Sequence, residues 1–572
     1  MIEVPLTYSQ LFDTDQFYQS LDIQTLPSEV SILMMSMINH QLFAFKKHNR
    51  DIFYSILDAW NVDIRLSWIN ALHSADHKYG RTLTIFNEWL VTEFIKYELV
   101  NYTPKDPEDN RSSERLEFLV IIKYLKFTED LINRKEHKRV VLSPAGQVDY
   151  LKTSYQSHIK QYHFSGGSNL LYEVIQAYCF LKIIKELEPE YYSNYSDLYK
   201  IPDPWKLATA IAPIVRDHTF NDTLQRSIPI IEIEKNSEYE RIFLNKILDI
   251  DEYEANESLK KRFIGIESKP LLKLEGNEYC VMSWRFLQQS IGTNLIFDFY
   301  KRSGINSKYH TLPLFKSHVV SLHITERTLF RTIMKVLYEK RYVSVFFDDD
   351  SALGLPDCYI RERNTIYLIE FKDLLFNNSI IESSTYDEFK QYIRSKLIEN
   401  HKGKPRGIGQ IISQIRHLNT KNYLFDKFSE KGFRRRSISI YPIIVYTDKH
   451  YSFPGVNQYI TDYLINHCPE TSFKLIHEPT LISLSYIFER LVMFKEKRLD
   501  KIIKDYHRKI NKSRNKIQNK SYNNYNEGLE NLEGMYASVE LTPLFYDEES
   551  ESKKLKRREI LSEINREINI KD

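Results

Sequence analysis

The stretch of sequence that decides the fold is Pro356–Asp373, which reads PDCYIRERNTIYLIEFKD. Two apolar runs of strand type are joined by an Asn-Thr turn, so we expect an antiparallel hairpin. Side chains alternate between the two faces of a strand, which puts Glu370 and Lys372 on one face. The tight turn folds Asp357 back beside Glu370. Two carboxylates and one lysine are therefore expected to meet at one end of a sheet.

The pattern continues on both sides of this hairpin. A helix is expected to begin at Thr325, with Glu326 in its first turn, where an acidic side chain suits the helix dipole. The other predicted elements are the strand VSVFF at 343–347, helices over 386–400 and 409–419, and the apolar strand SISIYPIIVYTD at 437–448. The predicted order is helix, three strands in a meander, helix and strand.

The polar residues at the end of the hairpin suit the hydrolysis of a phosphodiester. Mg²⁺ prefers oxygen ligands and usually takes only one or two protein carboxylates, keeping waters and substrate phosphate as its other ligands. Asp357 and Glu370 would supply such oxygens, and the main-chain carbonyl of Phe371 could supply a third. The ion would lower the pKa of a bound water, and Mn²⁺ is the expected substitute. Lys372 could orient the attacking water or stabilise the transition state as a fixed cation.

These residues resemble the motif of a known family. Pro356-Asp357, followed after 12 residues by Glu370-Phe371-Lys372, is similar to the motif of the PD-(D/E)XK nuclease superfamily. The element order also resembles that family's αβββαβ restriction-endonuclease-like core, over roughly residues 315 to 490. The resemblance implies a Mg²⁺-dependent endonuclease whose main substrate is DNA. A role in restriction or anti-phage defence follows by analogy alone.

The resemblance implies two further site residues. Family members often carry an acid on the first core helix, which maps to Glu326 as a catalytic residue and metal ligand, with Glu339 as a second choice. Many members have a glutamine on the helix after the E-x-K strand, and Gln410 and Gln414 lie four apart on one side of that helix. We favour Gln410, which is nearer the helix start. The long insertion over 377–406 could be a lid or a DNA-contacting helix.

The rest of the chain predicts a multidomain α+β protein. Residues 1–310 are expected to form a mostly helical region that binds substrate or a partner, with a β-hairpin over Lys269–Met282. Residues 112–155 weakly resemble a winged-helix module, against the alternative of a helical bundle with one hairpin. The nuclease domain is placed at 311–490. Residues 491–572, which carry charge blocks such as KKLKRR, are expected to form a charged helical C-terminal extension.

Composition excludes several classes of protein. The 79 Lys and Arg against 77 Asp and Glu give a net charge of +2, which excludes a uniformly basic nucleic-acid coat and leaves room for a local basic face. The four cysteines form no C-x-x-C pair, so zinc ribbons and disulfide scaffolds are not expected. The N-terminal residues show no secretory signal, and no apolar stretch predicts a membrane span. We therefore expect a cytoplasmic protein without a membrane partner.

Alternatives to an active DNA nuclease stay open at this point. The charged triplet could be a salt-bridged sheet edge, although charges midway along an apolar strand are costly unless paired or functional. The nuclease fold could be inert and serve as a nucleic-acid-binding or scaffold protein, or the substrate could be RNA. A homodimer or a partner protein that licenses cleavage is also possible. His73 and His77, four apart with Asp76 between them, could share a metal, but the H-E-x-x-H pattern is absent.

Overall fold

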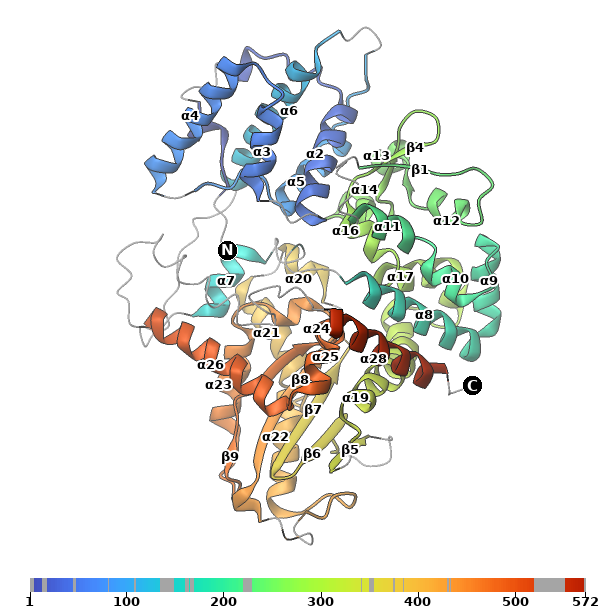
Figure 1. The fold of residues 1–572 in the computed structure, drawn as a ribbon, viewed down its shortest axis with the longest axis vertical. Coiled ribbons are helices and arrows are strands. Elements are labelled where there is room, and N and C mark those ends of the chain that lie inside the picture. The colour runs from blue at the N-terminus through green and yellow to red at the C-terminus, as the bar shows by residue number, and fades with distance from the viewer. Residues whose placement is uncertain are drawn as a thin grey trace. The chain divides into compact units, whose positions relative to one another are not determined.

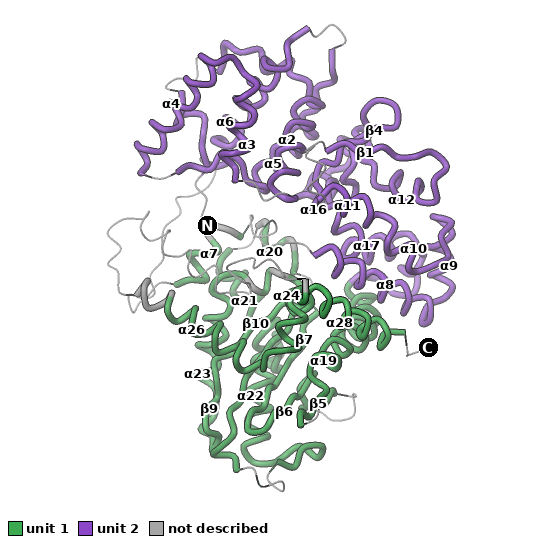
Figure 2. The backbone as a smooth tube through the Cα atoms, in the orientation of Figure 1, with its two compact units in different colours: residues 1–2, 138–165, 313–572 green, residues 3–137, 166–312 purple. Residues whose placement is uncertain are grey.

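The computed structural model divides the chain into two compact units (Figures 1 and 2). Unit 1 comprises residues 1–2, 138–165 and 313–572, and unit 2 comprises residues 3–137 and 166–312. The structure describes residues 5–12, 18–44, 48–80, 82–106, 110–133, 149–159, 164, 169–219, 229–340, 342–348, 354–373, 376–383, 385–428, 432, 434–518 and 551–569. The predicted boundary at 310 lies close to residue 313, where the third and longest part of unit 1 begins. The second part of unit 1 contains α7 (Tyr150–His158).

Unit 1 is built on a mixed six-stranded sheet. Its strand order is β10-β8-β7-β6-β5, with β9 paired to β8 beside β10. The β5-β6-β7 meander is antiparallel, whereas β8 runs parallel to β7 and β10 parallel to β8. The strands are β5 (Val343–Phe347), β6 (Cys358–Glu362), β7 (Thr365–Lys372), β8 (Ser439–Tyr446), β9 (Leu475–Ile476) and β10 (Thr480–Ser483). The hairpin and the apolar strand predicted from the sequence are confirmed at the level of these elements.

Helices cover both faces of this sheet (Figure 1). On one face, Leu368 of β7 belongs to a core cluster that includes the apolar side of α22 (Ile408–Thr420). On the other face, Phe371 stacks on Phe330 with ring centroids 4.5 Å apart. The remaining helices of unit 1 are α18 (Leu312–Phe315), η4 (Lys316–Phe330), α19 (Arg331–Tyr338), α20 (Asn378–Ser383), α21 (Tyr386–Leu397), η5 (Arg435–Ser437), η6 (Lys449–Ser452), α23 (Val456–His467), α24 (Leu484–Glu489), α25 (Leu491–Glu496), α26 (Leu499–Gln518) and α28 (Glu551–Asn569).

The first helix of the core differs from its prediction. The segment η4 is a π-helix, in which each turn is closed by hydrogen bonds to the carbonyl five residues earlier. Thr325 lies inside it and donates its hydroxyl to the Val320 carbonyl at 3.2 Å. The prediction that Thr325 caps a helix is therefore wrong, because the chain is already helical from Leu312, where α18 begins and runs directly into η4. Sequence signals for caps assume α-helical periodicity, which this segment does not follow.

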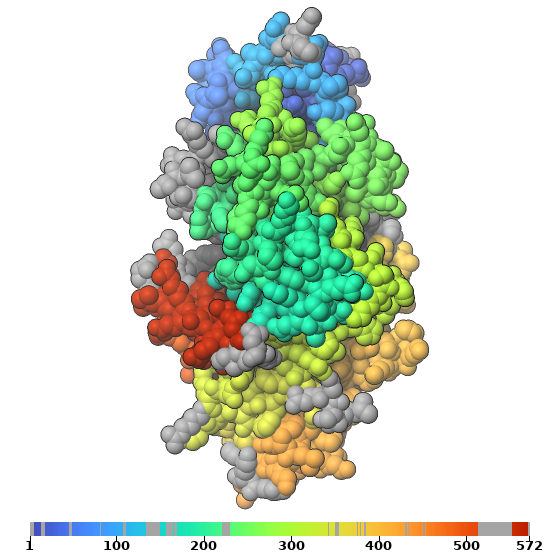
Figure 3. Space-filling model, turned by 90° about the vertical axis from the view of Figure 1, so that its right-hand side faces the viewer, coloured from blue at the N-terminus to red at the C-terminus, as the bar shows by residue number. Residues whose placement is uncertain are grey.

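The segment that follows the predicted nuclease domain belongs to the same compact unit. In α28, three isoleucines spaced by four residues are buried, and they are Ile560, Ile564 and Ile568. The helix contacts α19 and α25, and Lys335 Nζ lies 3.0 Å from Glu567 Oε2. Figure 3 draws α28 in red at the surface, where its other side chains are mostly exposed. The charged helical extension expected over 491–572 stays a prediction as a domain, and its described helices, α26 and α28, belong to unit 1.

The insertion over 377–406 contributes to the core rather than standing clear of it. In α21, Phe389, Ile393 and Leu397 are fully buried within the same core cluster as Leu368. Thr385 and Glu388 form a capping box that begins the helix. The apolar side of α21 therefore has a packing role, and its polar side carries the lysines and arginines that a lid or a DNA contact would use.

Unit 2 is mostly helical and contains a small sheet. The sheet order is β1-β4-β3-β2, and the predicted hairpin is present as the antiparallel pair β3-β4. The strands are β1 (Ile230–Glu232), β2 (Ile247–Leu248), β3 (Leu271–Lys273) and β4 (Glu278–Val281). The helices are η1 (Tyr8–Gln10), α2 (Ser28–Phe43), α3 (Asn49–Leu57), α4 (Val62–Tyr79), α5 (Glu88–Val100), α6 (Ser113–Asn133), α8 (Leu170–Leu187), α9 (Pro189–Tyr199), α10 (Pro204–Thr209), α11 (Ala212–Thr219), α12 (Glu240–Leu244), α13 (Ile250–Ala255), α14 (Glu257–Lys260), α15 (Ile264–Ser268), α16 (Trp284–Gln289), α17 (Thr293–Arg302) and η3 (Ile305–Ser307).

The winged-helix-like module predicted at 112–155 lies only partly within the described residues. The strand and turn of the winged-helix-like module fall on 134–148, outside the described residues, and its two helices, α6 and α7, belong to different units. Among the described helices, none combines the length and the apolar character that crossing a membrane requires.

Candidate functional site

Three charged side chains meet at the C-terminal end of β7. Cys358 of β6 pairs with Ile369 of β7, so Asp357, one residue earlier, lies beside Glu370. Lys372 Nζ is 2.8 Å from Glu370 Oε2 and 3.5 Å from Asp357 Oδ2. The hairpin thus brings together the three residues that the sequence motif singled out. Its register places Asp357, just before β6, opposite Glu370 near the end of β7.

The main chain of Phe371 also faces this cluster. Its N–H donates to Asp357 Oδ2 at 2.6 Å. The neighbouring carbonyl of Lys372 accepts from Thr447 N at 3.3 Å, on the β8 side of the strand. Within a strand, the N–H and C=O of one residue point the same way and alternate from residue to residue. The Phe371 carbonyl therefore points to the Asp357 side, where the sequence analysis placed a third oxygen donor.

Glu326 reaches the cluster from the π-helix. The pKa of Glu326 is raised to about 7, mainly by burial and in smaller part by repulsion from the nearby Asp357 carboxylate. Arg331 Nη2 lies 3.9 Å from Glu326 Oε1 and opposes this effect. Glu339, the second choice, is exposed at the end of α19. Of the two acids considered, Glu326 is the one that shares an electrostatic environment with Asp357 and Lys372.

The structure exchanges the roles of the two glutamines on α22. Gln414 is 2% exposed, and its Nε2 donates to Glu370 Oε1 at 2.6 Å. Gln410 instead accepts from Gly407 N at 2.9 Å and so caps the helix. Gly407 has a φ of +45°, and a Cβ there would lie 2.6 Å from the Leu397 carbonyl, so a glycine is required at this turn. The preference for Gln410 is therefore corrected in favour of Gln414.

The cluster carries more negative than positive charge. Glu370 is 0% exposed, and burial, followed by repulsion from Asp357, raises the pKa of its carboxyl well above the ordinary range. Burial alone would lower the pKa of Lys372, but attraction to Glu370 and Asp357 outweighs it, so that pKa is raised. Lys372 thus stays an ammonium, and Asp357 and Glu370 both pair with it, while Glu326 adds a third acid nearby. Such a set favours a proton or an additional cation.

A second group of contacts fixes η4 to the end of β7. Asp373 accepts hydrogen bonds from Ser321 Oγ at 2.9 Å and from Thr447 Oγ1 at 2.6 Å. Lys316 Nζ lies 3.4 Å from the same carboxylate. Burial opposes ionisation of Asp373, but Lys316 and the two hydroxyls outweigh it and lower its pKa. Asp373 therefore joins the π-helix, β7 and the residue after β8 directly beside Lys372.

The π-helical register explains how η4 can contact Asp373 through Lys316 and Ser321 and also carry Glu326 to the site. Lys316, Ser321, Glu326 and Arg331 are spaced five residues apart. In an α-helix of about 3.6 residues per turn, neighbours at this spacing point in different directions. Hydrogen bonds to the fifth residue make each turn wider, so that residues five apart come to lie above one another. The anchor at Asp373 and the acid at the site thus share one side of η4.

The donor set can be tested against the ion that the resemblance implies. Among the described residues, no group of three or more His, Cys, Asp and Glu side chains is arranged to hold a metal. Mg²⁺ needs fewer protein ligands than this, because it usually takes one or two carboxylates and keeps several waters. Asp357, Glu370 and the Phe371 carbonyl offer hard oxygen atoms in a region of excess negative charge. In the described part of the chain, Gln414 Oε1 is buried without a hydrogen-bond partner, which leaves an acceptor for a water. These donors fit a partly hydrated Mg²⁺ or Mn²⁺.

Sequence reasoning did not single out the residues that hold the site in place. Asp373, Ser321 and Thr447 fall outside the family motif, and each is an ordinary polar residue in the sequence. The signal that could have found them is the five-residue spacing of polar side chains ahead of Glu326, together with an acid directly after the E-x-K triplet.

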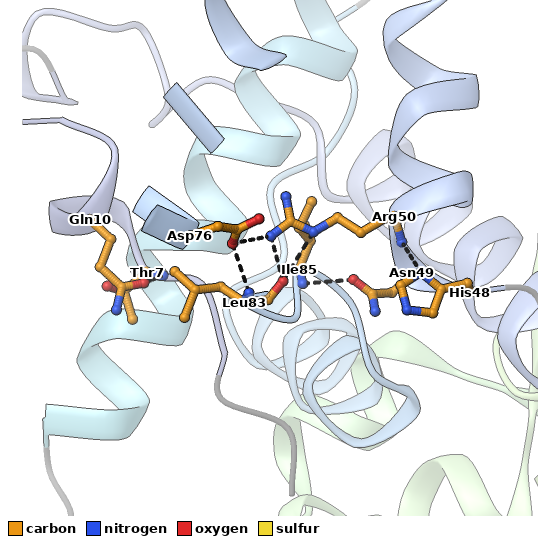
Figure 4. A network of polar contacts seen from close by, with 8 residues as sticks. All are labelled: Thr7, Gln10, His48, Asn49, Arg50, Asp76, Leu83 and Ile85. Carbon is orange, nitrogen blue, oxygen red and sulfur yellow. Dashed lines mark hydrogen bonds and ion pairs between the residues drawn. The ribbon is translucent and has the colours of Figure 1, made fainter. Parts of the chain in front are cut away.

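The other candidate metal site has a structural explanation. Asp76, between His73 and His77, accepts from Arg50 Nη2 at 2.7 Å and from Leu83 N at 2.8 Å. Arg50 also donates to the Leu83 carbonyl, and Figure 4 shows this network at the junction of α3, α4 and the loop after α4. The Asp76 carboxylate is thus committed to an ion pair with Arg50.

Comparisons with known proteins leave the family open. They bear neither on the resemblance to PD-(D/E)XK nucleases nor on any other assignment, so function has to be argued from the geometry above. No protein-family model, no curated protein and no solved structure matches this chain.

Proposed function

We propose that this protein is a metal-dependent phosphodiesterase, most simply a DNA endonuclease. The observation that carries the proposal is the convergence of Asp357, Glu370 and Lys372 at the end of β7, where two carboxylates share one lysine and the carboxyl of Glu326 is close enough to be affected by Asp357. A buried excess of carboxylates is costly for folding alone, and it is the arrangement that a divalent cation would stabilise.

Each residue of the cluster has a role that its position supports. Asp357 and Glu370, with the Phe371 carbonyl, would hold Mg²⁺ or Mn²⁺. When bound, such an ion acidifies water and neutralises charge on a phosphate. The Lys372 ammonium, fixed between Asp357 and Glu370, would place positive charge where a phosphate oxygen or the attacking water lies. Glu326, with its pKa raised to about 7, would exchange a proton with that water near neutral pH.

Gln414 supports the site rather than reacting in it. Its amide donates to Glu370 Oε1, which leaves the other carboxylate oxygen for Lys372. This bond fixes the orientation of the Glu370 carboxylate, so Gln414 is a positioning residue.

The choice of DNA as substrate rests on the resemblance to the PD-(D/E)XK superfamily. A sheet edge with carboxylates and a lysine acts on the phosphodiester, which DNA and RNA share. A cleavage assay on both nucleic acids therefore decides the substrate class. Whether cutting requires a second copy of the chain or a partner protein is open to the same assay. A role in restriction or anti-phage defence is part of the same proposal.

A specific observation also favours a second candidate, an inert nuclease fold that binds nucleic acid. Both oxygens of Glu370 already hold protein partners, Lys372 and Gln414, and the side chain is 0% exposed. If these bonds persist with substrate, the fold would bind without cutting.

The test is a cleavage assay on supercoiled plasmid, single-stranded DNA and RNA, each in Mg²⁺, Mn²⁺ or EDTA. Wild type is compared with Asp357→Ala and Lys372→Ala, and with Lys421→Ala as a control at an exposed lysine of the same unit, outside the 377–406 insertion. We expect metal-dependent cutting that falls by about 10²-fold or more in both site variants and stays unchanged in the control. Equal cutting by wild type and site variants would overturn the site, and binding without cutting would support the inert fold.

A further inference from the structure

The connection between α21 and α22 carries an excess of basic side chains. Residues 394–406 read RSKLIENHKGKPR, in which five lysines and arginines against one acid give a net charge of +4. The acid is Glu399, and Arg394 Nε donates to its Oε1 at 3.0 Å. Within the described part of the chain, the other four cations form no ion pair. We call these four the basic cluster, and they are Lys396, Lys402, Lys404 and Arg406.

The loop that carries three of these cations has a fixed shape. Asn400 Oδ1 accepts from Lys402 N at 3.0 Å and from Lys404 N at 2.9 Å. Arg406 N donates to the Ile398 carbonyl at 2.7 Å, which closes the loop. The three basic side chains themselves are exposed. Because its main chain is already ordered, the loop can present these charges to a ligand at a small entropic cost.

The fourth cation is partly buried next to another positive charge. Lys396 Nζ lies over the ring of Tyr392, 5.3 Å from its centroid. Burial, followed by repulsion from Arg406, lowers the pKa of Lys396. Neighbouring cations without an acid between them are stabilised by an anion, which is the reverse of the carboxylate excess at β7.

Contacts within unit 1 place the basic cluster at the end of the sheet where the β7 site lies. Phe376, four residues after β7, has its ring centroid 4.8 Å from that of Tyr392 on α21. The Tyr392 hydroxyl also accepts from Asn377 N at 3.1 Å. Lys396 stands over the same tyrosine, one turn further along α21. The contacts therefore lead directly from the end of β7 to the basic cluster.

The helix α22 links the loop to the site by a second route. Gly407 directly follows the loop and precedes α22, and Gln414 on this helix contacts Glu370. Seven residues of helix separate Gly407 from Gln414, which is a rise of about 10 Å. Successive phosphates of one DNA strand advance by about 3.4 Å along the axis, so 10 Å corresponds to about three nucleotides.

We propose that the basic cluster binds the phosphate backbone of DNA, a few nucleotides from the bond that the β7 site cuts. This inference rests on the proposed function and states how the substrate is held. Exposed cations on an ordered loop match the regular negative charges of a polyanion. Such phosphate contacts fix the position of a duplex without reading its sequence.

The experiment measures binding of the full chain to a fluorescein-labelled DNA duplex by anisotropy, in EDTA and over a series of salt concentrations. Wild type is compared with the double variant Lys402→Ala with Lys404→Ala. The matched control is Lys421→Ala with Lys474→Ala, which removes the same charge from exposed positions of the same unit. Lys474 N donates to the carbonyl of Ile438, just before β8, so this control lies towards the opposite end of the sheet.

We expect the cluster variant to bind DNA several-fold more weakly, and the control to bind like wild type. The slope of log affinity against log salt should fall by about 2 in the cluster variant, because each lost phosphate contact releases about one counterion fewer. Lys402→Arg with Lys404→Arg keeps both charges and should bind like wild type. No DNA binding by the wild-type chain, an unchanged slope in the cluster variant, or an equal loss in the control would overturn the proposal.

Two further arms separate this inference from its alternatives. A single-stranded RNA is the second probe, and cluster-dependent binding of RNA without binding of the duplex would overturn the choice of DNA. EDTA prevents metal-dependent cutting, so the binding measurement does not depend on catalysis. Cluster-dependent DNA binding by a chain that fails to cut would support this inference while contradicting the proposed enzymatic function.

Discussion

The Arg285–Glu88 pair of unit 2 and the cluster at the end of β7 in unit 1 handle buried charge differently. In unit 2, Arg285 pairs with Glu88 at 2.5 Å, with side-chain exposures of 5% and 11%. Arg50 and Asp76, drawn within the network of Figure 4, form a further pair at 2.7 Å. In unit 1, at the end of β7, Asp357 and Glu370 share Lys372, and the carboxyl of Glu326 lies within their electrostatic influence. In a matched ion pair each charge is neutralised by its partner. A buried excess of carboxylates is instead stabilised by a proton or by a cation from solution. The excess, rather than burial itself, distinguishes a site from a structural ion pair.

The largest expected effect comes from breaking a matched pair. Arg285→Met leaves Glu88 buried without its charge partner, so we expect the free energy of unfolding to fall by about 3–5 kcal/mol. The double variant Glu88→Leu with Arg285→Met should recover most of this loss, because no unpaired charge is left. Denaturant unfolding measures both. A single variant as stable as wild type would show that the pair is not a structural element.

Removing a charge from the unmatched cluster should have the opposite sign. The pKa of Glu326 is raised to about 7 in the folded state, against an ordinary value near 4.5. Between these values the folded state holds a proton that the unfolded state has released, so stability falls as pH rises from 4.5 through 7. Glu326→Gln has no carboxyl to titrate at this position, so its stability should lack this decrease with pH.

The measurement is denaturant unfolding in EDTA from pH 4 to pH 8. At pH 8 the variant should be more stable than wild type by up to about 3 kcal/mol, since one pKa unit corresponds to about 1.4 kcal/mol. Below pH 4.5 the two proteins should be equally stable. A difference that does not change with pH would contradict the raised pKa.

A smaller effect tests the anchor of the π-helix. Ser321→Ala removes a hydrogen bond to Asp373 and should cost about 1 kcal/mol of stability. If the anchor also positions Glu326, Mn²⁺ affinity should fall by about tenfold or more, as is usual for groups that support metal ligands. Ser317→Ala, at an exposed position of the same helix, is the control for both readouts. Loss of stability with unchanged affinity would limit Ser321 to a structural role.

The smallest effect separates the two glutamines of α22. Gln410→Ala removes a helix cap and should cost about 1 kcal/mol of stability without changing Mn²⁺ affinity. Gln414→Ala leaves Glu370 with one partner fewer and should weaken Mn²⁺ binding. Calorimetric titration of both variants measures this. Equal affinities in the two proteins would contradict the assignment of Gln414 to the site.

The sequence predicted those parts of the fold that depend on local periodicity. Alternation and turn chemistry located β5, β6, β7 and β8, and the register of one hairpin was enough to bring Asp357 to Glu370. The same reasoning gave the face shared by Glu370 and Lys372. These features follow from side-chain alternation, which a strand cannot avoid.

What the sequence could not give depends on contacts between distant segments. Gln410 and Gln414 occupy the same side of a helix, and only the packing of α22 on β7 decides which one reaches Glu370. The π-helix departs from the period by which helices are recognised, so its start and its anchor at Asp373 were missed. The docking of α28 on α19 depends on three isoleucines in a segment dominated by charge.

The most direct test of the central claim is calorimetric titration of the wild-type chain and Asp357→Ala with Mn²⁺, at pH 8 and moderate salt. The claim is that the unmatched carboxylates at β7 form a cation site. We therefore predict binding of one cation to wild type, and a loss of affinity of about 10²-fold or more in Asp357→Ala. Absence of binding to the wild-type chain, or the same affinity in both proteins, would contradict it.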